Sequence, residues 1–171
     1  MKAQVVAIAA MTIDGKIALH SRHFTDWTSR EDKSFLRAVL DDYEVIVLGN
    51  NTYQIGGAAF SKRKCIVLTR SNQTAQGKDG NLIFWSPTIS SIEAVLEPFR
   101  KVALLGGTQT YSYFLERDLI DELYLTIEPV VFGKGLNLFD CRDDLLMKFR
   151  LVSVRNLNET GTILLHYGRR L

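Results

Sequence analysis

Short apolar runs alternate with segments of helical patterning along this chain, and that alternation constrains the fold more than any other feature. Six runs consist almost wholly of aliphatic and aromatic residues: 5–11, 45–48, 64–68, 82–84, 102–105 and 123–127. Short runs without polar alternation are typical of strands buried on both faces of a parallel sheet. We therefore expect six core strands.

The segments between the runs predict helices and a closing hairpin. Residues 31–40, 90–99 and 108–116 each carry apolar side chains at helical spacing. The later runs 149–154 and 163–167 alternate more strictly and flank a turn-forming stretch, which predicts an antiparallel pair. The sequence therefore predicts one α/β domain over 1–171, with a central, mostly parallel sheet, flanking helices and a C-terminal antiparallel hairpin.

Composition excludes several classes of partner. The net charge of +2 gives no electrostatic case for a nucleic acid or an acidic membrane surface. The apolar run 5–11 is too short to span a bilayer and lacks the layout of a secretory signal, which favours a cytoplasmic protein. Cys65 and Cys141 lie far apart in no metal-ligand spacing, so we expect neither a metal site nor a disulfide.

A double-glycine turn is the strongest candidate for a binding site. The strand predicted at 102–105 ends in Gly106 and Gly107, and Thr108 and Gln109 open the next helix. Glycines allow a ligand to approach the backbone, and a helix N-terminus presents free N–H groups to a phosphate. The alternative is a purely structural turn with Thr108 as the N-cap.

Two further strand ends carry residues suited to phosphate. They are Gly49, Asn51 and Thr52 after the run 45–48, and Thr69, Arg70 and Ser71 after the run 64–68. An arginine offers several coplanar donors to a phosphate monoester, although an isolated loop arginine is more often a solvated cation. Three such strand ends at one edge of a sheet predict a nucleotide site there.

The segment around Trp27 and Asp32 is the candidate for substrate chemistry. Ser29 and Asp32 have the spacing of a capping box, so Asp32 has a structural interpretation as well as a functional one. A buried carboxylate on the first turn of a helix beside a cleft could instead hold a proton or bind an amidine-like edge. Trp27 could form a wall for a flat ring or simply pack.

The loop after the first strand has apolar residues where polar ones are usual. Ile17 and Ala18 follow the turn signal of Asp14 and Gly15. We expect them either to cover a ligand or to bury Ile17 against the core.

Together these motifs resemble the family that joins the dihydrofolate reductases to the reductases of riboflavin biosynthesis, over essentially the whole chain. Residues 12–18, 27–32 and 121–135 resemble the C-terminal reductase domain of the riboflavin-biosynthesis deaminase/reductase. Residues 49–53 and 67–71 look more like dihydrofolate reductase.

The resemblance implies hydride transfer from NADPH bound across the strand ends. The nicotinamide would be flanked by Ala9, Ala10 and Ile17, and the phosphates would lie at Gly49, Asn51 and Thr52. The adenosine phosphate would lie at Thr69, Arg70 and Ser71. The pyrophosphate would be bracketed by Gly106, Gly107, Thr108 and Gln109. Asp32 follows Trp27 by the spacing at which a dihydrofolate reductase places its acid. It would be the catalytic residue, and both would bind substrate.

Two departures from the family pattern bear on specificity. Asn50 stands where dihydrofolate reductases usually carry an arginine, so a preference for NADPH over NADH would rest mainly on Arg70. The Asp-Asp-Pro stretch of riboflavin reductases is absent, and residues 54–60 read Gln-Ile-Gly-Gly-Ala-Ala-Phe instead.

The sequence leaves three functions open. The first is NADPH-dependent reduction of a small heterocycle, led by the ribosylaminouracil phosphate of riboflavin biosynthesis. The others are reduction of dihydrofolate or another pterin, and nucleotide binding without catalysis. The resemblance also implies a homodimer, for which Tyr124 and a strand over 128–132 are the candidate surface.

Overall fold

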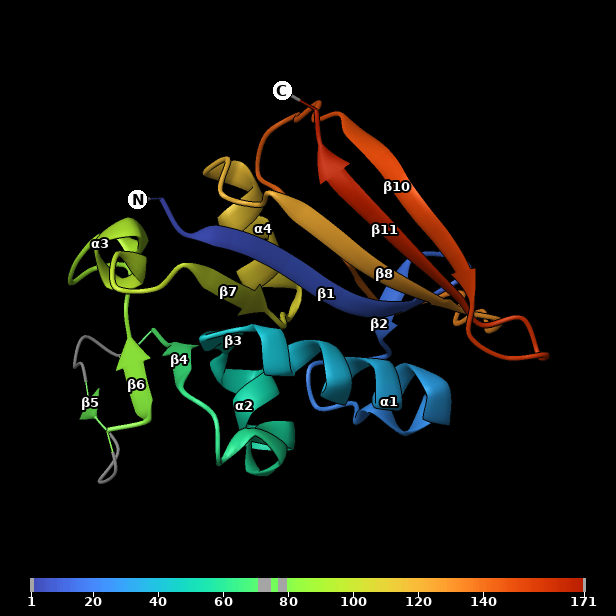
Figure 1. Ribbon diagram of the computed structural model, residues 1–171, viewed down its shortest axis with the longest axis horizontal. Coiled ribbons are helices and arrows are strands. Elements are labelled where there is room, and N and C mark those ends of the chain that lie inside the picture. The colour runs from blue at the N-terminus through green and yellow to red at the C-terminus, as the bar shows by residue number, and fades with distance from the viewer. Residues whose placement is uncertain (1, 71–74, 77–79, 171) are drawn as a thin grey trace.

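The computed structural model describes residues 2–70, 75–76 and 80–170, and within them one nine-stranded sheet dominates (Figure 1). The strand order is β10-β11-β8-β1-β7-β3-β4-β6-β5. The strands are β1 (Gln4–Thr12), β3 (Val45–Gly49), β4 (Cys65–Leu68), β5 (Ala75–Gln76), β6 (Leu82–Trp85), β7 (Lys101–Leu104), β8 (Glu122–Glu128), β10 (Phe149–Asn156) and β11 (Ile163–Arg169).

The centre of this sheet is parallel and its end is antiparallel. Strands β8, β1, β7, β3, β4 and β6 run in one direction. Strand β11 then pairs antiparallel with β8, and β10 pairs antiparallel with β11. Both the mostly parallel sheet and the C-terminal hairpin that the sequence predicts are confirmed. All six apolar runs form strands, because each is rich in residues that pack well on a pleated, buried surface.

Helices cover both faces of the sheet. Helix α1 (Arg30–Val39) and α2 (Asn50–Gly56) pack on one face, and α3 (Ile92–Leu96) and α4 (Thr108–Glu116) pack on the other. Short 3-10 helices cover Thr25–Trp27, Leu40–Asp42 and Gly57–Phe60. No helix in the described ranges is both long and apolar enough to cross a membrane.

The predicted helix ends are confirmed for α4 and are wrong for α3. Helix α4 begins and ends where its pattern predicts, whereas α3 is shorter than the predicted 90–99. Pro98 explains the early end, because a proline has no N–H with which to extend the hydrogen bonds of the helix.

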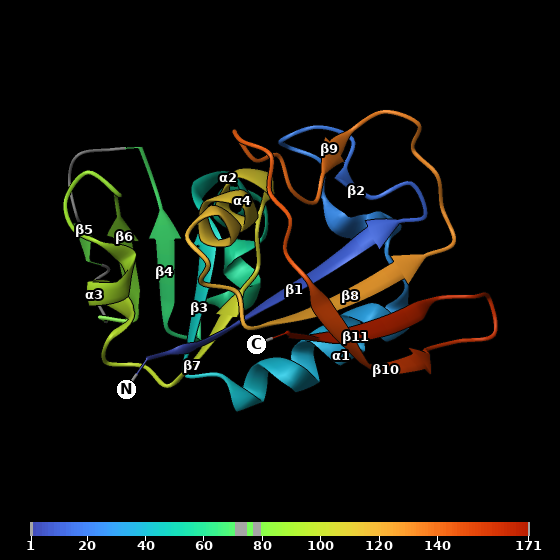
Figure 2. The ribbon, with the colours of Figure 1, turned by 90° about the horizontal axis from the view of Figure 1, so that it is seen from above.

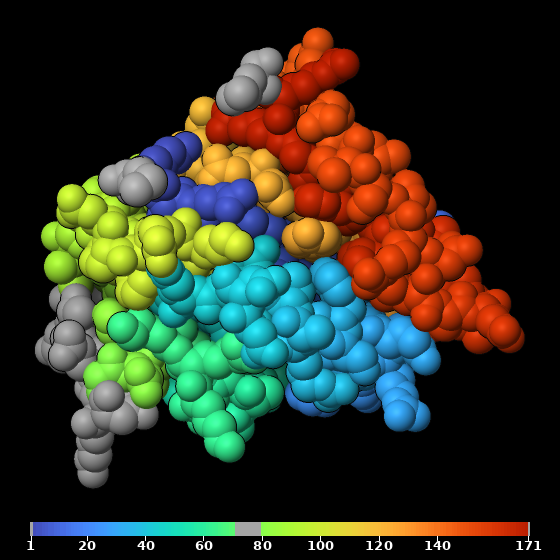
Figure 3. Space-filling model, in the orientation of Figure 1, coloured from blue at the N-terminus to red at the C-terminus, as the bar shows by residue number. Residues whose placement is uncertain are grey.

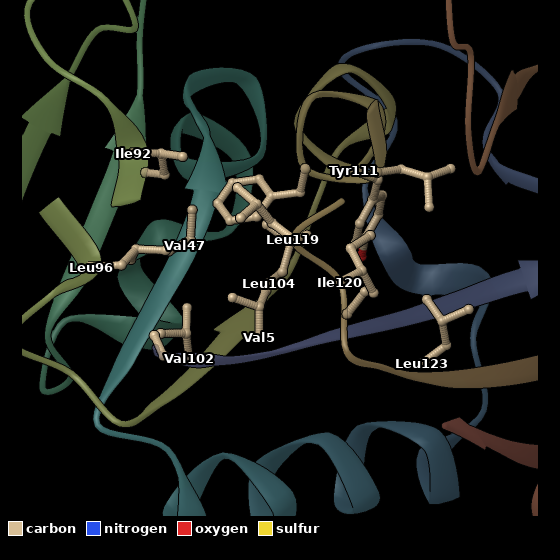
Figure 4. Packing of buried hydrophobic residues seen from close by; sticks show 14 of the residues in the cluster. Val5, Val47, Ile92, Leu96, Val102, Leu104, Tyr111, Leu119, Ile120 and Leu123 are labelled. Carbon is tan, nitrogen blue, oxygen red and sulfur yellow. The ribbon is translucent and has the colours of Figure 1, made fainter. Parts of the chain in front are cut away.

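The larger core lies between the sheet and helices α3 and α4 (Figure 4). Val47, Val102 and Leu104 contribute side chains with no exposed surface from β3 and β7. Ile92 from α3 and Phe114 from α4 are equally buried against them. Burial on this scale fixes the register of the central strands, since a slip by one residue would turn each apolar side chain to the other face.

A small second sheet lies beyond the carboxyl ends of β1 and β8 (Figure 2). It pairs β2 (Lys16–Ala18) with β9 (Leu136–Asn137), which the sequence pattern does not predict. The Asp14 carboxylate joins the two loops concerned, because it accepts hydrogen bonds from the backbone N–H groups of Phe132 (3.2 Å) and Gly133 (2.8 Å). The loop after β1 is thereby fixed above the sheet.

The structure shows where the surface predicted for a dimer lies but does not test the dimer itself. Strand β8 lies between β1 and β11, so it offers no free edge. Tyr124 on β8 stacks on His166 with 4.2 Å between the ring centroids and packs against Phe35 of α1. The prediction of a strand over 128–132 is wrong, because β8 ends at Glu128. The free edge at this end of the sheet belongs to β10.

We predict that the substitution Leu104→Ala lowers the free energy of unfolding by about 2–5 kcal/mol, because it leaves a cavity in a fully buried position. Denaturant unfolding followed by circular dichroism measures the change. Leu146→Ala is the control: that side chain is 85% exposed, so its loss should change stability by less than about 0.5 kcal/mol. Equal effects of the two substitutions would contradict this placement of the core.

Candidate active site

A cleft of about 1550 Å³ opens where the parallel strands end. It exceeds the volume of roughly 300–1,000 Å³ that is usual for a single drug-sized ligand, so it has room for a dinucleotide and a second molecule. Twelve of the predicted site residues line it: Ala9, Ala10, Ile17, Asp32, Gly49, Asn51, Thr52, Thr69, Arg70, Gly107, Thr108 and Gln109. The structure thus brings together residues from six separate segments of the chain.

Of the other three predicted residues, two do not line the cleft and one lies outside the described part of the chain. Gly106 is buried, and a Cβ on it would lie 2.5 Å from the Tyr111 ring. Trp27 packs edge-on against Phe132, with 5.0 Å between the ring centroids. Ser71 lies outside the described residues.

The turns after β3 and β7 are in direct backbone contact. The N–H of Gly49 donates to the carbonyl of Gly106 over 2.6 Å. A Cβ on Gly49 would lie only 2.6 Å from Oγ1 of Thr110, so this approach requires glycine. At Gly107, in contrast, a Cβ would meet only Oγ1 of Thr52, at 3.6 Å. The two turns therefore form one continuous backbone surface in the cleft.

The N-terminus of α4 faces this surface without a side-chain cap. The structural alternative for Thr108, an N-cap, is wrong, because the N-cap residue is Gly107 and makes no side-chain hydrogen bond. The Thr108 hydroxyl instead donates to the carbonyl of Asn137, next to the small sheet. The first N–H groups of α4 therefore have no capping side chain and could bind an anionic group.

Arg70 and Gln109 connect the end of β4 to the start of α4. Nη2 of Arg70 donates to Oε1 of Gln109 over 2.9 Å, and both side chains are exposed at the cleft. Arg70 is therefore oriented toward the turn that carries the glycines. An oriented guanidinium with further N–H groups is suited to a phosphate monoester.

Asp32 lies in the cleft wall and does not complete a capping box. Oγ of Ser29 accepts from the Asp32 N–H over 3.1 Å, which is the expected N-cap bond. The Ser29 N–H, however, donates to Oε1 of Glu128 over 2.7 Å rather than to Asp32. The Asp32 carboxyl is hydrogen-bonded to Thr126 and Thr28 and is only 8% exposed. Asp32 nevertheless lines the cleft.

The surroundings of Asp32 favour its protonated form. Burial is the largest effect and raises the pKa of its carboxyl, while the hydrogen bonds from Thr126 and Thr28 act against it. The charge of Glu128 raises the pKa further, and the charge of Lys33 lowers it. A carboxyl that keeps its proton above its ordinary pKa in a cleft is a candidate general acid.

Trp27 is not among the residues that line the cleft. Its indole Nε1 is buried and has no hydrogen-bond partner among the described residues. Such an N–H usually binds an ordered water or a ligand atom. The prediction that Trp27 binds substrate is untested by this geometry.

Tyr111 is one of the cleft residues that sequence reasoning missed. The helical pattern explains it as a core residue of α4, and its hydroxyl does donate to the carbonyl of Ile8 over 2.6 Å. Its ring nevertheless lines the cleft, and the negative charge of Asp32, together with burial, raises its pKa. A tyrosine within electrostatic reach of the candidate acid is visible only once the fold is known.

Thr126 and Glu128 were missed for a different reason. The run 123–127 reads as apolar, yet Glu122, Tyr124, Thr126 and Glu128 occupy alternate positions of β8. That alternation is the signal that could have found them, because it assigns one face of the strand to polar contacts.

Ile17 satisfies both interpretations of the loop after β1. It packs against the larger core and also lines the cleft beside Ala18. The loop is fixed by the pairing of β2 with β9 and by Asp14, whose pKa is lowered mainly by the hydrogen bond from Thr12. It therefore forms a fixed cover over one end of the cleft.

Positive side chains outnumber negative ones around the cleft. Lys33, Arg37, Lys62, Arg63 and Arg70 line it, against Asp32, Asp41 and Asp140. Arg63 is bound to Asp41 and to the carbonyl of Leu40. Arg37 and Lys62 lie in the part lined by α1 and the Gly57–Phe60 helix, away from Arg70. The cleft therefore suits ligands with anionic groups.

Comparison with known proteins agrees with this architecture. The family model described as dihydrofolate reductase matches residues 4–133. The chain is 25% identical over 178 residues to the uncharacterized protein YwjB of Bacillus subtilis (strain 168), with 99% of each chain covered.

Two solved structures share the fold. A diaminohydroxyphosphoribosylaminopyrimidine deaminase/5-amino-6-(5-phosphoribosylamino)uracil reductase from Thermotoga maritima has a TM-score of 0.78 at 20% identity, covering 99% of this chain and 57% of that chain. Dihydrofolate reductase from Enterococcus faecalis, complexed with NADP(H), has a TM-score of 0.69 at 18% identity, covering 100% and 99%.

The fold, with a cleft at its strand ends, is an α/β fold of the dihydrofolate-reductase type. The family match spans most of the chain, so the protein belongs to the dihydrofolate reductase family, whose members are oxidoreductases. The resemblance inferred from the motifs is confirmed.

Proposed function

We propose that this protein is an NADPH-dependent reductase of a small heterocycle, of the 5-amino-6-(5-phosphoribosylamino)uracil reductase type. The observation that carries the proposal is the convergence of four strand ends and the buried Asp32 on one cleft. The presence of NADP(H) in the related Enterococcus faecalis enzyme supports the choice of cofactor.

The residues at the strand ends fit a dinucleotide phosphate. The joined turns at Gly49 and Gly107 form a surface where a ligand can approach the backbone, and a side chain on Gly107 would occupy that space. The uncapped start of α4 would bind the pyrophosphate, and Arg70 would bind the adenosine phosphate. When bound, NADPH supplies a hydride from its nicotinamide ring.

The chain's own residues would position the substrate, exclude water and supply a proton. Ala9, Ala10 and Ile17 form an apolar wall for a flat ring at the end of β1. Asp32 would hydrogen-bond the heterocycle and hold the proton that the reduced product needs. The fixed loop after β1 would shield this region from water.

Reduction of dihydrofolate or another pterin is the second candidate. The substrate part of the cleft is lined by Ile55, Ala58, Ala59 and Phe60, which occupy the segment where riboflavin reductases carry Asp-Asp-Pro. An apolar lining in the same cleft as the buried Asp32 carboxyl suits a fused ring with an amidine-like edge. Nucleotide binding without catalysis is the remaining alternative, and substrate-dependent oxidation of NADPH would exclude it.

The first prediction concerns cofactor preference. Fluorescence titration should show micromolar binding of NADPH, weaker binding of NADH, and a loss of about 10- to 100-fold in NADPH affinity on Arg70→Ala, because a hydrogen-bonded charge contact is removed. Affinity for NADH should not change. Arg142→Ala, an exposed arginine outside the cleft, is the matched control. Absence of binding to either nucleotide would refute the proposed function.

The second prediction separates catalysis from binding. Asp32→Asn should lower turnover by about 10²- to 10⁴-fold with NADPH affinity unchanged, because the general acid is lost. The same variant should be at least as stable as the parent at pH 8. Because the folded pKa of Asp32 is raised, the folded state binds the proton more tightly than the unfolded chain does, and stability falls as pH rises through that range. Thermal unfolding and steady-state kinetics give both quantities, and unchanged turnover would exclude Asp32 as the acid.

The protein also has a surface suited to a homodimer. Leu151, Val152 and Val154 are 48%, 48% and 56% exposed on β10, the free edge strand at the margin of the molecule (Figure 3). An apolar edge strand without a neighbour readily pairs with another strand. A second copy of the chain, related by a two-fold axis, would cover the same patch on both protomers.

Val154→Lys should therefore convert a dimer to a monomer in light scattering or sedimentation. Val131→Lys is the control, since Val131 is 63% exposed in the segment 128–132 that the sequence favoured as the interface. A monomeric Val131→Lys protein alongside a dimeric Val154→Lys protein would place the interface away from β10.

A further inference from the structure

Glu128 is a second buried carboxylate beside the candidate acid. It ends β8 and is 3% exposed, and it shares a strand face with Thr126, which hydrogen-bonds Asp32. The proposed reaction assigns no role to it. Buried carboxylates are rare unless their oxygens are fully hydrogen-bonded, so its contacts need an explanation.

The hydrogen bonds at one oxygen of Glu128 are fixed by its neighbours. Oδ1 of Asn158 accepts from Thr160 and from the N–H of Thr162, which directs its amide nitrogen to Oγ1 of Thr162 over 2.9 Å. Because Oγ1 of Thr162 accepts there, its single proton is directed to Oε2 of Glu128 over 2.8 Å. Glu128 is the acceptor in that bond.

The other oxygen holds the start of helix α1. Oε1 of Glu128 accepts from the Ser29 N–H, and Ser29 in turn caps the helix by accepting from the Asp32 N–H. The end of β8 is thus joined to the first turn of α1 through one side chain. Asp32 is therefore fixed at two points. Its backbone N–H is bound by Ser29, and its carboxyl is hydrogen-bonded to Thr126 and Thr28.

The charged groups around Asp32 act on the pKa of its carboxyl in opposite directions, and the charge of Glu128 has the larger effect. Glu128 on β8 opposes a negative charge on Asp32, and Lys33 on α1 is the cation that favours it. Nζ of Lys33 is bound to the carbonyl of Thr28 over 2.8 Å. Tyr111 faces Asp32 from α4, and His20 and His23 lie in the loop that lines the same cleft.

We propose that Glu128 is a positioning residue for Asp32: by accepting from the Ser29 N–H it ties the first turn of α1 to the end of β8, and it places a second buried acidic group beside that turn. The importance of this positioning for catalysis rests on the proposed reductase function. The placement and the protonation of Asp32 do not, because both can be measured in the protein without cofactor or substrate.

The test is a pH titration of the Asp32 carboxyl by NMR, with isotope-labelled aspartate and the Asp32→Asn variant to assign the signal. Glu128→Gln keeps the shape of the side chain and removes its charge, so the midpoint of Asp32 should move to lower pH. Glu159→Gln, the same change at an exposed position of the nearby turn, should leave it in place. An unchanged midpoint in a folded Glu128→Gln protein would overturn the electrostatic part of the proposal.

Glu128→Asp tests the positioning part and also covers the case in which Glu128→Gln does not fold. It keeps the charge but shortens the side chain by one methylene, so the midpoint of Asp32 should stay high while the Ser29 and Asp32 amides exchange faster with solvent. Unchanged exchange at these amides would overturn the positioning role, and a midpoint lowered to the ordinary range of an aspartate would overturn the electrostatic one. A failed NADPH titration would leave both readouts intact, so the two proposals can fail separately.

Discussion

The contact between the Gly49 N–H and the Gly106 carbonyl is the constraint on which the cleft depends. It brings the turn after β3 against the turn after β7 more closely than any side chain would allow. The start of α4 is placed by the same turn, and Arg70 reaches that helix through Gln109. This part of the candidate site is therefore formed by backbone, and its shape depends on strand order and on glycine at position 49.

The sheet and most helices could be predicted because their signals are local. Apolar runs specify buried strands, and the pattern of α4 specifies both of its ends. The small sheet could not be predicted, since strands of two or three residues carry no periodicity. The end of α3 was misjudged because helical spacing continues in the sequence past Leu96, although Pro98 has no N–H to extend the helix.

The candidate site was predictable wherever its residues follow strands, and not where they approach from other elements. Gly49, Arg70 and Gly107 belong to the first group, and the topology alone brings them together. Tyr111 and Glu128 belong to the second group, because each has an adequate structural role in its own element. The capping motif at Ser29 shows the same ambiguity: its backbone half is formed as expected, but Glu128 takes the place of the Asp32 side chain.

Strand β1 occupies the middle of the sheet, yet both of its neighbours come from far along the chain. It pairs with β7 at residues 101–104 and with β8 at residues 122–128. During synthesis its apolar sequence therefore leaves the ribosome long before either partner exists. Non-local pairing of this kind slows folding. Until the partner strands are made, the unpaired edges of β1 are exposed and prone to aggregation. The protein's yield in a cell should accordingly depend on how well chaperones protect its first dozen residues, a demand imposed by the same strand order that builds the cleft.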